Sequence, residues 1–285
     1  MPADRWADLH LHTRWSDGTL DVVGTVRRAQ EAGLAAIAIT DHDTISPDLL
    51  SPVAEIEGME VICGVELKAD IGGERGEILG YFLAPRHPAL GELFRWMAEA
   101  RQQRMEAMVR RCQEVLGEPI AFSEVVAGVA GSVGRPHLAA VLVRRGFARD
   151  YEDAFQRYLA RGAPCYVPLP RPASRQVIAA IRSAGGVASL AHPCFLSFPD
   201  WEVTLRKLAG EGLAAVEVYY PYASSRQPLH TDPREIEALV VELGLLPSGG
   251  SDDHGPGSVK DSLGSVRVPY WPVVEELRAL SSVVR

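Results

Sequence analysis

The chain has 285 residues, of which 47% are hydrophobic, and a formal net charge of −8. A chain of this length can bury the core of one large α/β domain, or of such a domain with an insertion. The acidic balance excludes tight binding to duplex nucleic acid, which needs a strongly basic surface.

Cysteine usage and apolar runs bear on the cellular compartment. The four cysteines are scattered without a CxxC pair, which argues against a thiolate zinc site and favours a reducing compartment. Cys194 follows His192 by two residues and is expected to be a small buried side chain rather than a metal ligand. No apolar run in the sequence is long enough to span a bilayer, and the first residues lack an apolar leader segment. We therefore expect a soluble cytoplasmic protein.

The alternation of strand and helix patterns along the first part of the chain predicts an α/β fold. Residues 34–40 form a short, almost wholly apolar run, which is typical of a strand buried on both faces. Gly33 ends the preceding helix, and Ser46–Pro47 has the composition of a helix start. The expected elements are a strand at 7–12, a helix at 20–32, a strand at 34–40, a helix from 46, and strands at 60–65 and 78–83.

Residues 88–165 interrupt this alternation. Apolar residues recur at helical spacing over 90–116, and further helices are expected at 136–145 and 151–161. No strand pattern of comparable strength lies between them. We therefore interpret this segment as an α-helical insertion.

The alternation resumes after residue 165, so residues 1–87 and 166–285 are expected to form one domain around the insertion. Gly185-Gly186 ends a helix, and the apolar run that follows it predicts another buried strand. The expected elements are helices at 173–184, 201–210, 233–243 and 272–280 and strands at 187–191, 213–220, 245–248 and 263–268.

Two histidines lie two residues apart in the expected first strand, within Asp8-Leu9-His10-Leu11-His12. Successive side chains of a strand alternate between its faces, so His10 and His12 point the same way, about 7 Å apart. Asp17, in the Ser-Asp-Gly turn that follows, can return a carboxylate to the same pocket. These side chains are predicted to bind metal; the alternative is a pair of buried histidines bonded to backbone carbonyls.

Further histidines and carboxylates follow the other expected strands. In open α/β sheets and in α/β barrels, sites are built at the carboxyl ends of parallel strands. The set consists of imidazoles and carboxylates and contains no cysteine. Mn, Fe or Zn suits such a set better than Ca or Mg. Two metals bridged by a carboxylate generate hydroxide near neutral pH, and a metal pair stabilises the attacking and leaving oxygens of phosphoryl transfer. The residues in these positions are His42, Glu66, His192, Asp252 and His254.

Five short motifs resemble those of the polymerase-and-histidinol-phosphatase (PHP) family. The resemblance implies a distorted (β/α)7 TIM-like barrel, with the helical insertion capping the active site. The insertion and its segment Gly134-Arg135-Pro136-His137-Leu138-Ala139 are also similar to the stand-alone, nucleotide-acting branch of the family. The motifs are Asp8 to Thr13 with Ser16-Asp17-Gly18, Ile39 to Thr44, Gly64-Val65-Glu66, Ala191-His192-Pro193 and Gly250 to Gly255.

Carried over by position, the resemblance implies two to three divalent metal ions. Glu66 would bridge the first metal to a second, which His192 also binds. Glu77 stands where many relatives have a histidine, and a carboxylate there can ligate the second metal while changing the metal preference. The same resemblance gives catalytic roles to Glu66, His192 and Asp252. The implied ligands are His10, His12, Glu66 and Asp252 for the first metal, Glu66, Glu77 and His192 for the second, and Asp17, His42 and His254 for the third.

Three basic side chains are predicted to bind the substrate. Arg135 and His137 begin a helix, where unpaired N–H groups and the helix dipole favour anions, and an arginine can hold phosphate in a bidentate manner. Lys68 shares a strand face with Glu66, and it would either neutralise phosphate or pair with a nearby carboxylate. The tyrosines of 219–222 end another expected strand and could stack a base or pack in the core.

We therefore expect a metal-dependent phosphoesterase that hydrolyses nucleotide phosphate esters by a metal-bridging hydroxide. The first choice of substrate is a nucleoside 3′,5′-bisphosphate or the end of a short oligonucleotide. The alternative enzymes are a cyclic-nucleotide phosphodiesterase and a histidinol-phosphate phosphatase. A noncatalytic metal-stabilised module is the alternative from a different class; it predicts lost ligands, whereas here each ligand is present or replaced by another ligand type. The expected partner is a small phosphorylated molecule, with no membrane and no duplex nucleic acid.

Overall fold

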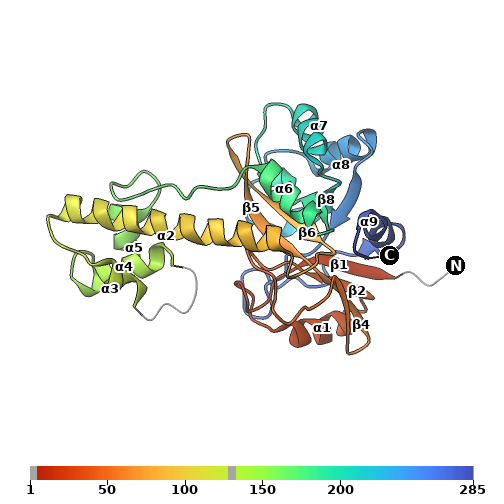
Figure 1. The fold of residues 1–285 in the computed structure, drawn as a ribbon, viewed down its shortest axis with the longest axis horizontal. Coiled ribbons are helices and arrows are strands. Elements are labelled where there is room, and N and C mark those ends of the chain that lie inside the picture. The colour runs from red at the N-terminus through yellow and green to blue at the C-terminus, as the bar shows by residue number, and fades with distance from the viewer. Residues whose placement is uncertain (1–4, 128–132, 285) are drawn as a thin grey trace. The chain divides into compact units, whose positions relative to one another are not determined.

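The computed structural model describes residues 5–127 and 133–284 and divides the chain into two compact units. Residues 1–94 and 171–285 form the first unit, and residues 95–170 form the second. Helix α2 (Pro88–Leu116), yellow in Figure 1, begins in the first unit and continues into the second. Neither described range contains a helix that is long and apolar enough to cross a membrane.

The first sheet is built around the N-terminal strand. Its parallel strands β1 (Trp6–Leu11) and β2 (Ala36–Ile39) are buried along almost their whole length, as the apolar run at 34–40 predicts. The two edge strands are antiparallel to their neighbours. The order is β10 (Val268–Pro269), β1, β2, β4 (Met59–Cys63) and β3 (Val53–Ile56).

The second sheet combines an antiparallel hairpin with parallel strands. The hairpin turns at Gly72 and Gly73, whose φ angles of 67° and 96° lie in the left-handed region that glycine adopts without steric cost. The next strand is antiparallel to the hairpin, and the last two are parallel to it. The order is β5 (Val65–Ile71), β6 (Glu74–Tyr81), β7 (Val187–Leu190), β8 (Ala215–Tyr219) and β9 (Leu246–Gly249).

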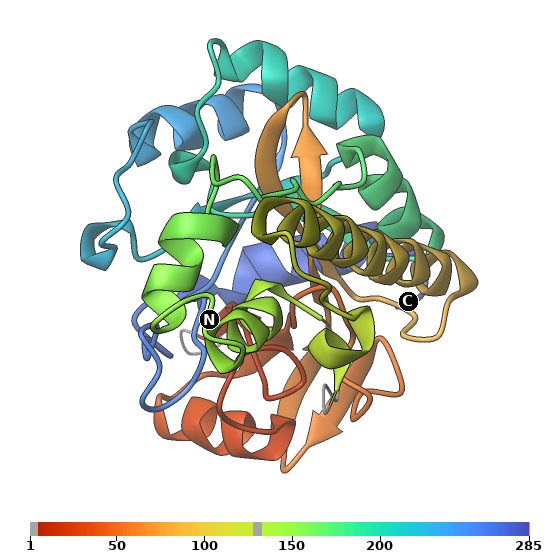
Figure 2. The ribbon, with the colours of Figure 1, turned by 90° about the vertical axis from the view of Figure 1, so that its left-hand side faces the viewer.

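Helices pack on both sheets, as Figure 2 shows in a second view. Helix α1 (Val22–Glu31) contacts β2 and β4, and its buried residues Val22, Val26 and Ala29 recur at helical spacing. Further helices α6 (Ser174–Ser183) and α8 (Pro233–Glu242) contact the second sheet, α7 (Trp201–Glu211) contacts α6, and α9 (Glu275–Leu280) follows β10.

Two isolated bridges join the sheets where the site residues lie. Leu11 pairs with Asp253, and His42 pairs with Glu66. Among the strand pairings of residues 5–127 and 133–284, no closed barrel is found. The architecture is therefore a mixed α/β fold with two sheets.

The strand expected at 60–65 is divided at Gly64 between the two sheets. A Cβ at this position would lie 2.8 Å from the Gly80 carbonyl oxygen and 2.8 Å from Thr40 Cγ2, so the close approach requires glycine. The chain thus leaves β4 in the first sheet and enters β5 in the second. As a consequence, Glu66 begins an antiparallel hairpin instead of following a parallel strand.

Two other expected elements differ in the structure. The helix expected from Ser46–Pro47 does not form, because Pro52 disfavours helical backbone just before it and the segment between the two prolines is too short to nucleate a helix. A turn replaces it and leads into β3. The strand expected at 263–268 is shortened to β10, because Asp253 Oδ1 accepts the N–H groups of Ser262 and Leu263 at 2.7 and 2.9 Å and holds them in a loop.

The second unit is helical and has its own core. Besides α2 it contains α3 (Phe122–Val126), α4 (Arg135–Arg144), α5 (Tyr151–Ala154) and the wider helical turn η1 (Phe155–Leu159). Apolar side chains at helical spacing on α2 pack against those of α4 and η1. The buried residues include Met105, Met108, Cys112, Leu138, Leu142 and Leu159.

Candidate metal centre

The first strand presents two imidazoles to one side, as its alternation predicts. His10 lies in β1, and His12 follows its end, where its N–H donates to the Asp253 carbonyl at 2.9 Å. Both side chains are buried, and their ring centroids are 5.2 Å apart. The pair therefore faces one interior space at the junction of the two sheets.

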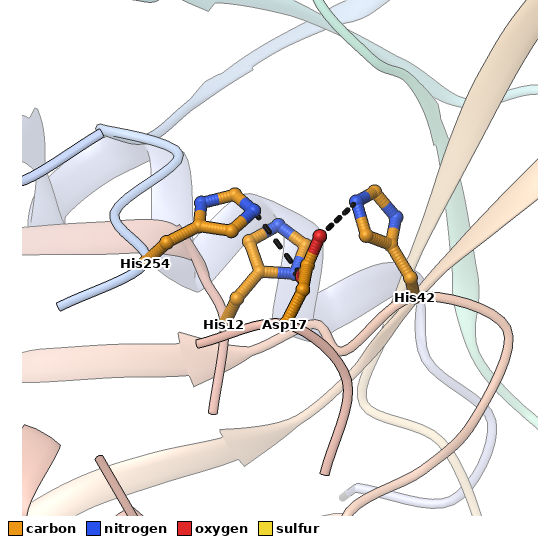
Figure 3. A group of neighbouring side chains, drawn as sticks. All are labelled: His12, Asp17, His42 and His254. Carbon is orange, nitrogen blue, oxygen red and sulfur yellow. Dashed lines mark ion pairs between the residues drawn. The ribbon is translucent and has the colours of Figure 1, made fainter. Parts of the chain in front are cut away.

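Asp17 lies between three histidines from separate segments (Figure 3). Its Oδ1 is 3.3 Å from His254 Nε2, and its Oδ2 is 3.7 Å from His42 Nε2. The rings of His12 and His254 stack with centroids 4.1 Å apart. One atom from each of the four side chains lies within 4.8 Å of the others, a spacing that can hold a metal ion.

Glu66 connects this group to the interior of the site. Its Oε2 is 3.3 Å from His10 Nε2, 3.4 Å from His12 Nε2 and 2.8 Å from His42 Nδ1. Asp252 Oδ1 approaches the same two imidazoles of His10 and His12, at 3.7 and 3.3 Å. His10, His12 and Glu66 form a second group with metal-ligand spacing.

Glu77 lies in a third group, with His42 and Glu66. The other oxygen of Glu66, Oε1, is 3.0 Å from His192 Nε2, and Glu77 Oε2 is 3.5 Å from the same nitrogen. The departure noted in the sequence is thus a carboxylate that faces the same space as Glu66 and His192. The two oxygens of Glu66 therefore face different imidazoles, Oε1 that of His192 and Oε2 those of His10, His12 and His42.

Several buried polar atoms of the site lack hydrogen-bond partners among the described residues, which bears on whether a cation fits between them. Within the ranges 5–127 and 133–284, the atoms without a hydrogen-bond partner include His10 Nε2, both ring nitrogens of His12, Glu66 Oε2 and Asp252 Oδ1. Leaving such atoms unsatisfied costs free energy, so native interiors pair them with protein, water or metal. The atoms converge on one another, and the donor set of imidazoles and carboxylates is the one that Zn, Mn and Fe take. The residues therefore fit divalent metal ions.

The pKa values of the two buried histidines of β1 and its end are also consistent with a site for metal ions. Burial lowers the pKa of His12 to about 4, so its imidazole is neutral and able to ligate near pH 7. Burial opposes protonation of His10 as well, but the carboxylates of Glu217, Glu66 and Asp252 outweigh it and hold the pKa of His10 well above its usual value. Without a cation, the buried carboxylates are thus balanced by protons on neighbouring imidazoles.

Glu217, in the middle of β8, is a site residue that the sequence analysis missed. Its Oε1 lies 2.9 Å from His10 Nδ1, and its Oε2 accepts the His192 backbone N–H at 2.8 Å. The side chain is fully buried. One signal was available: a glutamate stands inside the apolar run Ala-Ala-Val-Glu-Val-Tyr, where a charge is costly unless paired.

Asp41 positions the loop that carries Asp17. Its two oxygens accept the Thr13 N–H and hydroxyl, both at 2.7 Å, and the Ser16 hydroxyl at 2.6 Å. The carboxylate is buried next to the metal-ligand candidates without being part of their groups. Its neighbour His42 is a predicted ligand from the sequence, whereas no role is predicted there for Asp41.

Backbone geometry at the site is strained at two candidate ligands. His192 has a φ of 26° and Asp252 a φ of 56°, values that side chains other than glycine rarely adopt. Such conformations cost about 1–3 kcal/mol each and persist where the surrounding contacts determine them. The hydrogen bond from the His192 N–H to Glu217 is one such contact.

The residues predicted to bind substrate lie in different surroundings. Lys68 Nζ is 3.2 Å from Asp43 Oδ2 and 3.9 Å from Glu77 Oε1, so it forms the ion pair that the sequence left open. In the second unit, the Arg135 guanidinium donates to the Leu159 carbonyl at 3.3 Å, and His137 Nδ1 accepts the Gly134 N–H at 2.9 Å. These contacts position both residues at the start of α4, and their binding of substrate stays a prediction.

Gly250, the first residue of the motif Gly250 to Gly255, lets the chain that follows β9 approach β1 closely. A Cβ at Gly250 would lie 2.4 Å from the His10 backbone nitrogen and 2.8 Å from Asp8 Oδ1. We expect Gly250→Ala to lower the free energy of unfolding by about 1–3 kcal/mol and to reduce activity, because the backbone at His10 must shift. Urea denaturation and turnover measure the two effects. Gly210→Ala in α7, where a Cβ meets nothing within 4 Å, is the control, and an equal response of both variants contradicts the interpretation.

Comparison with known proteins identifies the family to which the fold belongs. Residues 8–163 match the sequence profile of the PHP domain. The 5′-3′ exoribonuclease Rnm of Escherichia coli is 35% identical over 258 residues, which cover 87% of this chain and 85% of the relative. The 3′,5′-nucleoside bisphosphate phosphatase of Chromobacterium violaceum is 29% identical over 264 residues, 88% and 87% of the two chains. The crystal structure of a candidate metal-dependent phosphoesterase from Bifidobacterium adolescentis has a TM-score of 0.69 at 28% identity and covers 98% of this chain and 97% of that one.

The α/β fold and its cluster of histidines and carboxylates define a metal-dependent phosphoesterase. The chain belongs to the PHP-domain family, because the family profile matches more than half of it and a relative 35% identical covers most of it. The resemblance seen in the five sequence motifs is thereby confirmed.

Proposed function

We infer that the protein hydrolyses phosphate esters of nucleotides, with a nucleoside 3′,5′-bisphosphate or the end of a short oligonucleotide as its substrate. The observation that carries this inference is the position of Glu66, which is shared by two groups of candidate metal ligands. Several buried atoms of these groups have no hydrogen-bond partner among residues 5–127 and 133–284. The exoribonuclease and the bisphosphate phosphatase described above support the choice of nucleotide substrates.

Two to three divalent ions, which we propose to be Mn, Fe or Zn, would be held by these groups. Bound divalent cations activate water near neutral pH and neutralise the charge of a phosphate ester. His12 and His42 each belong to two groups, which supports neighbouring sites rather than isolated ones. The proposed ligands are His10, His12, Glu66 and Asp252 for one ion, Glu66, Glu77 and His192 for another, and Asp17, His42 and His254 for a third.

The remaining roles are proposals that the residues' surroundings support to different degrees. Lys68 would neutralise substrate phosphate from a position beside Glu77. Arg135 and His137 would bind substrate phosphate. Residues 88–165 would cover the active site as a cap. Both roles rest on the resemblance of the sequence motifs. We also propose that the two sheets correspond to the distorted (β/α)7 barrel of the motifs, which the two bridges between the sheets support.

Substrate comparison tests the proposed function. After chelation and reloading with Mn, we expect faster turnover of adenosine 3′,5′-bisphosphate than of 5′-AMP, a cyclic nucleotide or histidinol phosphate, with products separated by chromatography. His192→Ala is expected to reduce that turnover roughly a hundredfold or more, because it removes a metal ligand. Preference for the cyclic nucleotide or for histidinol phosphate would select that alternative activity. If none of these compounds and no short oligonucleotide is turned over in a metal-dependent manner, the noncatalytic metal-stabilised module would be the supported alternative.

A further inference from the structure

A cavity of about 550 Å³ lies in the first unit, between the loop that follows β8 and the loop that follows β9. Its volume falls in the range of small-molecule sites, which is about 300–1,000 Å³. Most of the residues that line it carry a polar or charged side chain, among them Tyr220, Ser225, Arg226, Ser258, Lys260 and Asp261. None of these residues belongs to the groups with metal-ligand spacing.

Asp252 separates this cavity from the candidate metal centre. Its Oδ1 faces His10 and His12, while its Oδ2 accepts a hydrogen bond from the Tyr220 hydroxyl at 2.8 Å and pairs with the Lys260 ammonium. Tyr220 and Lys260 also line the cavity. The cavity and the candidate metal centre therefore share Asp252 as a common wall.

The charges on the cavity wall favour an anion. Lys260 is paired with Asp252, and Asp261 is paired with Arg28, whose Nη2 lies 2.6 Å from Asp261 Oδ1. Arg226 is the remaining charged side chain of the wall, and within residues 5–127 and 133–284 it has no ion-pair partner. An arginine in this state presents its full set of N–H donors, in the planar arrangement that matches a phosphate.

A hydroxyl next to Arg226 adds a further donor. Ser225 Oγ accepts the Gln227 backbone N–H at 3.1 Å, which leaves its own O–H free to donate. Both Ser225 and Arg226 line the cavity and follow the short helix η3 (Tyr222–Ser224). A guanidinium and a hydroxyl donor side by side are typical ligands of phosphate oxygens.

We propose that this cavity binds a second phosphate group of the nucleotide substrate, the one that is not hydrolysed, with Arg226 as its main ligand. The proposal rests on the proposed function, since it concerns the same substrate held at the same centre. It makes the cavity the part of the site that selects a nucleotide with two phosphates over one with a single phosphate.

Steady-state kinetics of Arg226→Ala test the proposal. With adenosine 3′,5′-bisphosphate we expect KM to rise roughly tenfold or more, from the loss of charged hydrogen bonds, with kcat little changed. With the adenosine monophosphate that carries only the phosphate to be hydrolysed, we expect the variant to match the wild type, because this compound lacks the group that Arg226 would hold. Arg234→Ala is the matched control, because Arg234 is also exposed and lies at the start of α8, outside the cavity.

Equilibrium binding separates this proposal from the proposed function. Calorimetry on chelated protein is expected to show that Arg226→Ala weakens binding of adenosine 3′,5′-bisphosphate and leaves binding of adenosine unchanged. Equal affinity and equal KM in variant and wild type would overturn the cavity proposal while leaving the hydrolase intact. Absence of nucleotide turnover by the wild type would overturn the proposed function instead, and the binding measurement would still decide whether Arg226 holds a phosphate.

Discussion

Glu66→Gln is expected to abolish turnover and to release metal from two of the three groups. The two oxygens of Glu66 lie between 2.8 and 3.4 Å from ring nitrogens of His10, His12, His42 and His192. Within residues 5–127 and 133–284, no other carboxylate contacts as many imidazoles of the candidate ligands. Glutamine has nearly the same shape but no negative charge, and its NH₂ group cannot bind a cation. We expect activity to fall by more than about a hundredfold, beyond the effect of losing a residue that only orients ligands.

Metal content by mass spectrometry and phosphate release measure this effect together. Glu55→Gln is the control, because Glu55 is an exposed glutamate on β3, also in the first unit. A Glu66→Gln enzyme that kept its metal and its turnover would show that the groups around Glu66 are not the catalytic centre.

Glu217→Gln is expected to lower metal affinity and activity about 10- to 100-fold, the usual cost of losing a residue that orients metal ligands. The carboxylate of Glu217 contacts His10 Nδ1 with one oxygen and accepts the His192 N–H with the other. Glutamine offers a single acceptor oxygen, so one of these two donors loses its partner. The result is a less constrained His10 ring or a released His192 backbone, whose φ of 26° needs support.

Titration of the chelated protein with Mn, followed by activity at saturating metal, separates affinity from turnover for this variant. Glu237→Gln on the exposed side of α8 serves as the control. We expect added Mn to restore part of the lost activity, because Glu217 acts through the ligands. Unchanged Mn affinity would contradict the role given to Glu217.

The candidate ligands could be found in the sequence because each carries a local signal. His10 and His12 are related by the two-residue period of a strand, and His192 directly follows a short apolar run. Such patterns depend on neighbours along the chain, so they are visible before folding. The structure brings these side chains and Glu66, Asp252 and Glu77 together, as their placement after or within strands predicts.

The supporting residues could not be found in this way. Glu217 acquires its role from His10, which is 207 residues away in the sequence, and from the backbone of His192. Arg226 lines a cavity whose opposite wall comes from residues 251–262. Neither contact leaves a periodic pattern, because it depends on which loops the two sheets bring side by side.

The sequence by itself thus determined the α/β class, the buried parallel strands, the helical character of the second unit and the identity of the candidate ligands, because burial and side-chain period are local properties. Only the tertiary structure decided the division at Gly64 into two sheets, since the need for glycine arises from Gly80 and Thr40 across the junction. The same holds for the role of Glu217, which contacts His10 across 207 residues of sequence. These features depend on contacts between segments that are distant in the sequence, and such contacts leave no local sequence pattern.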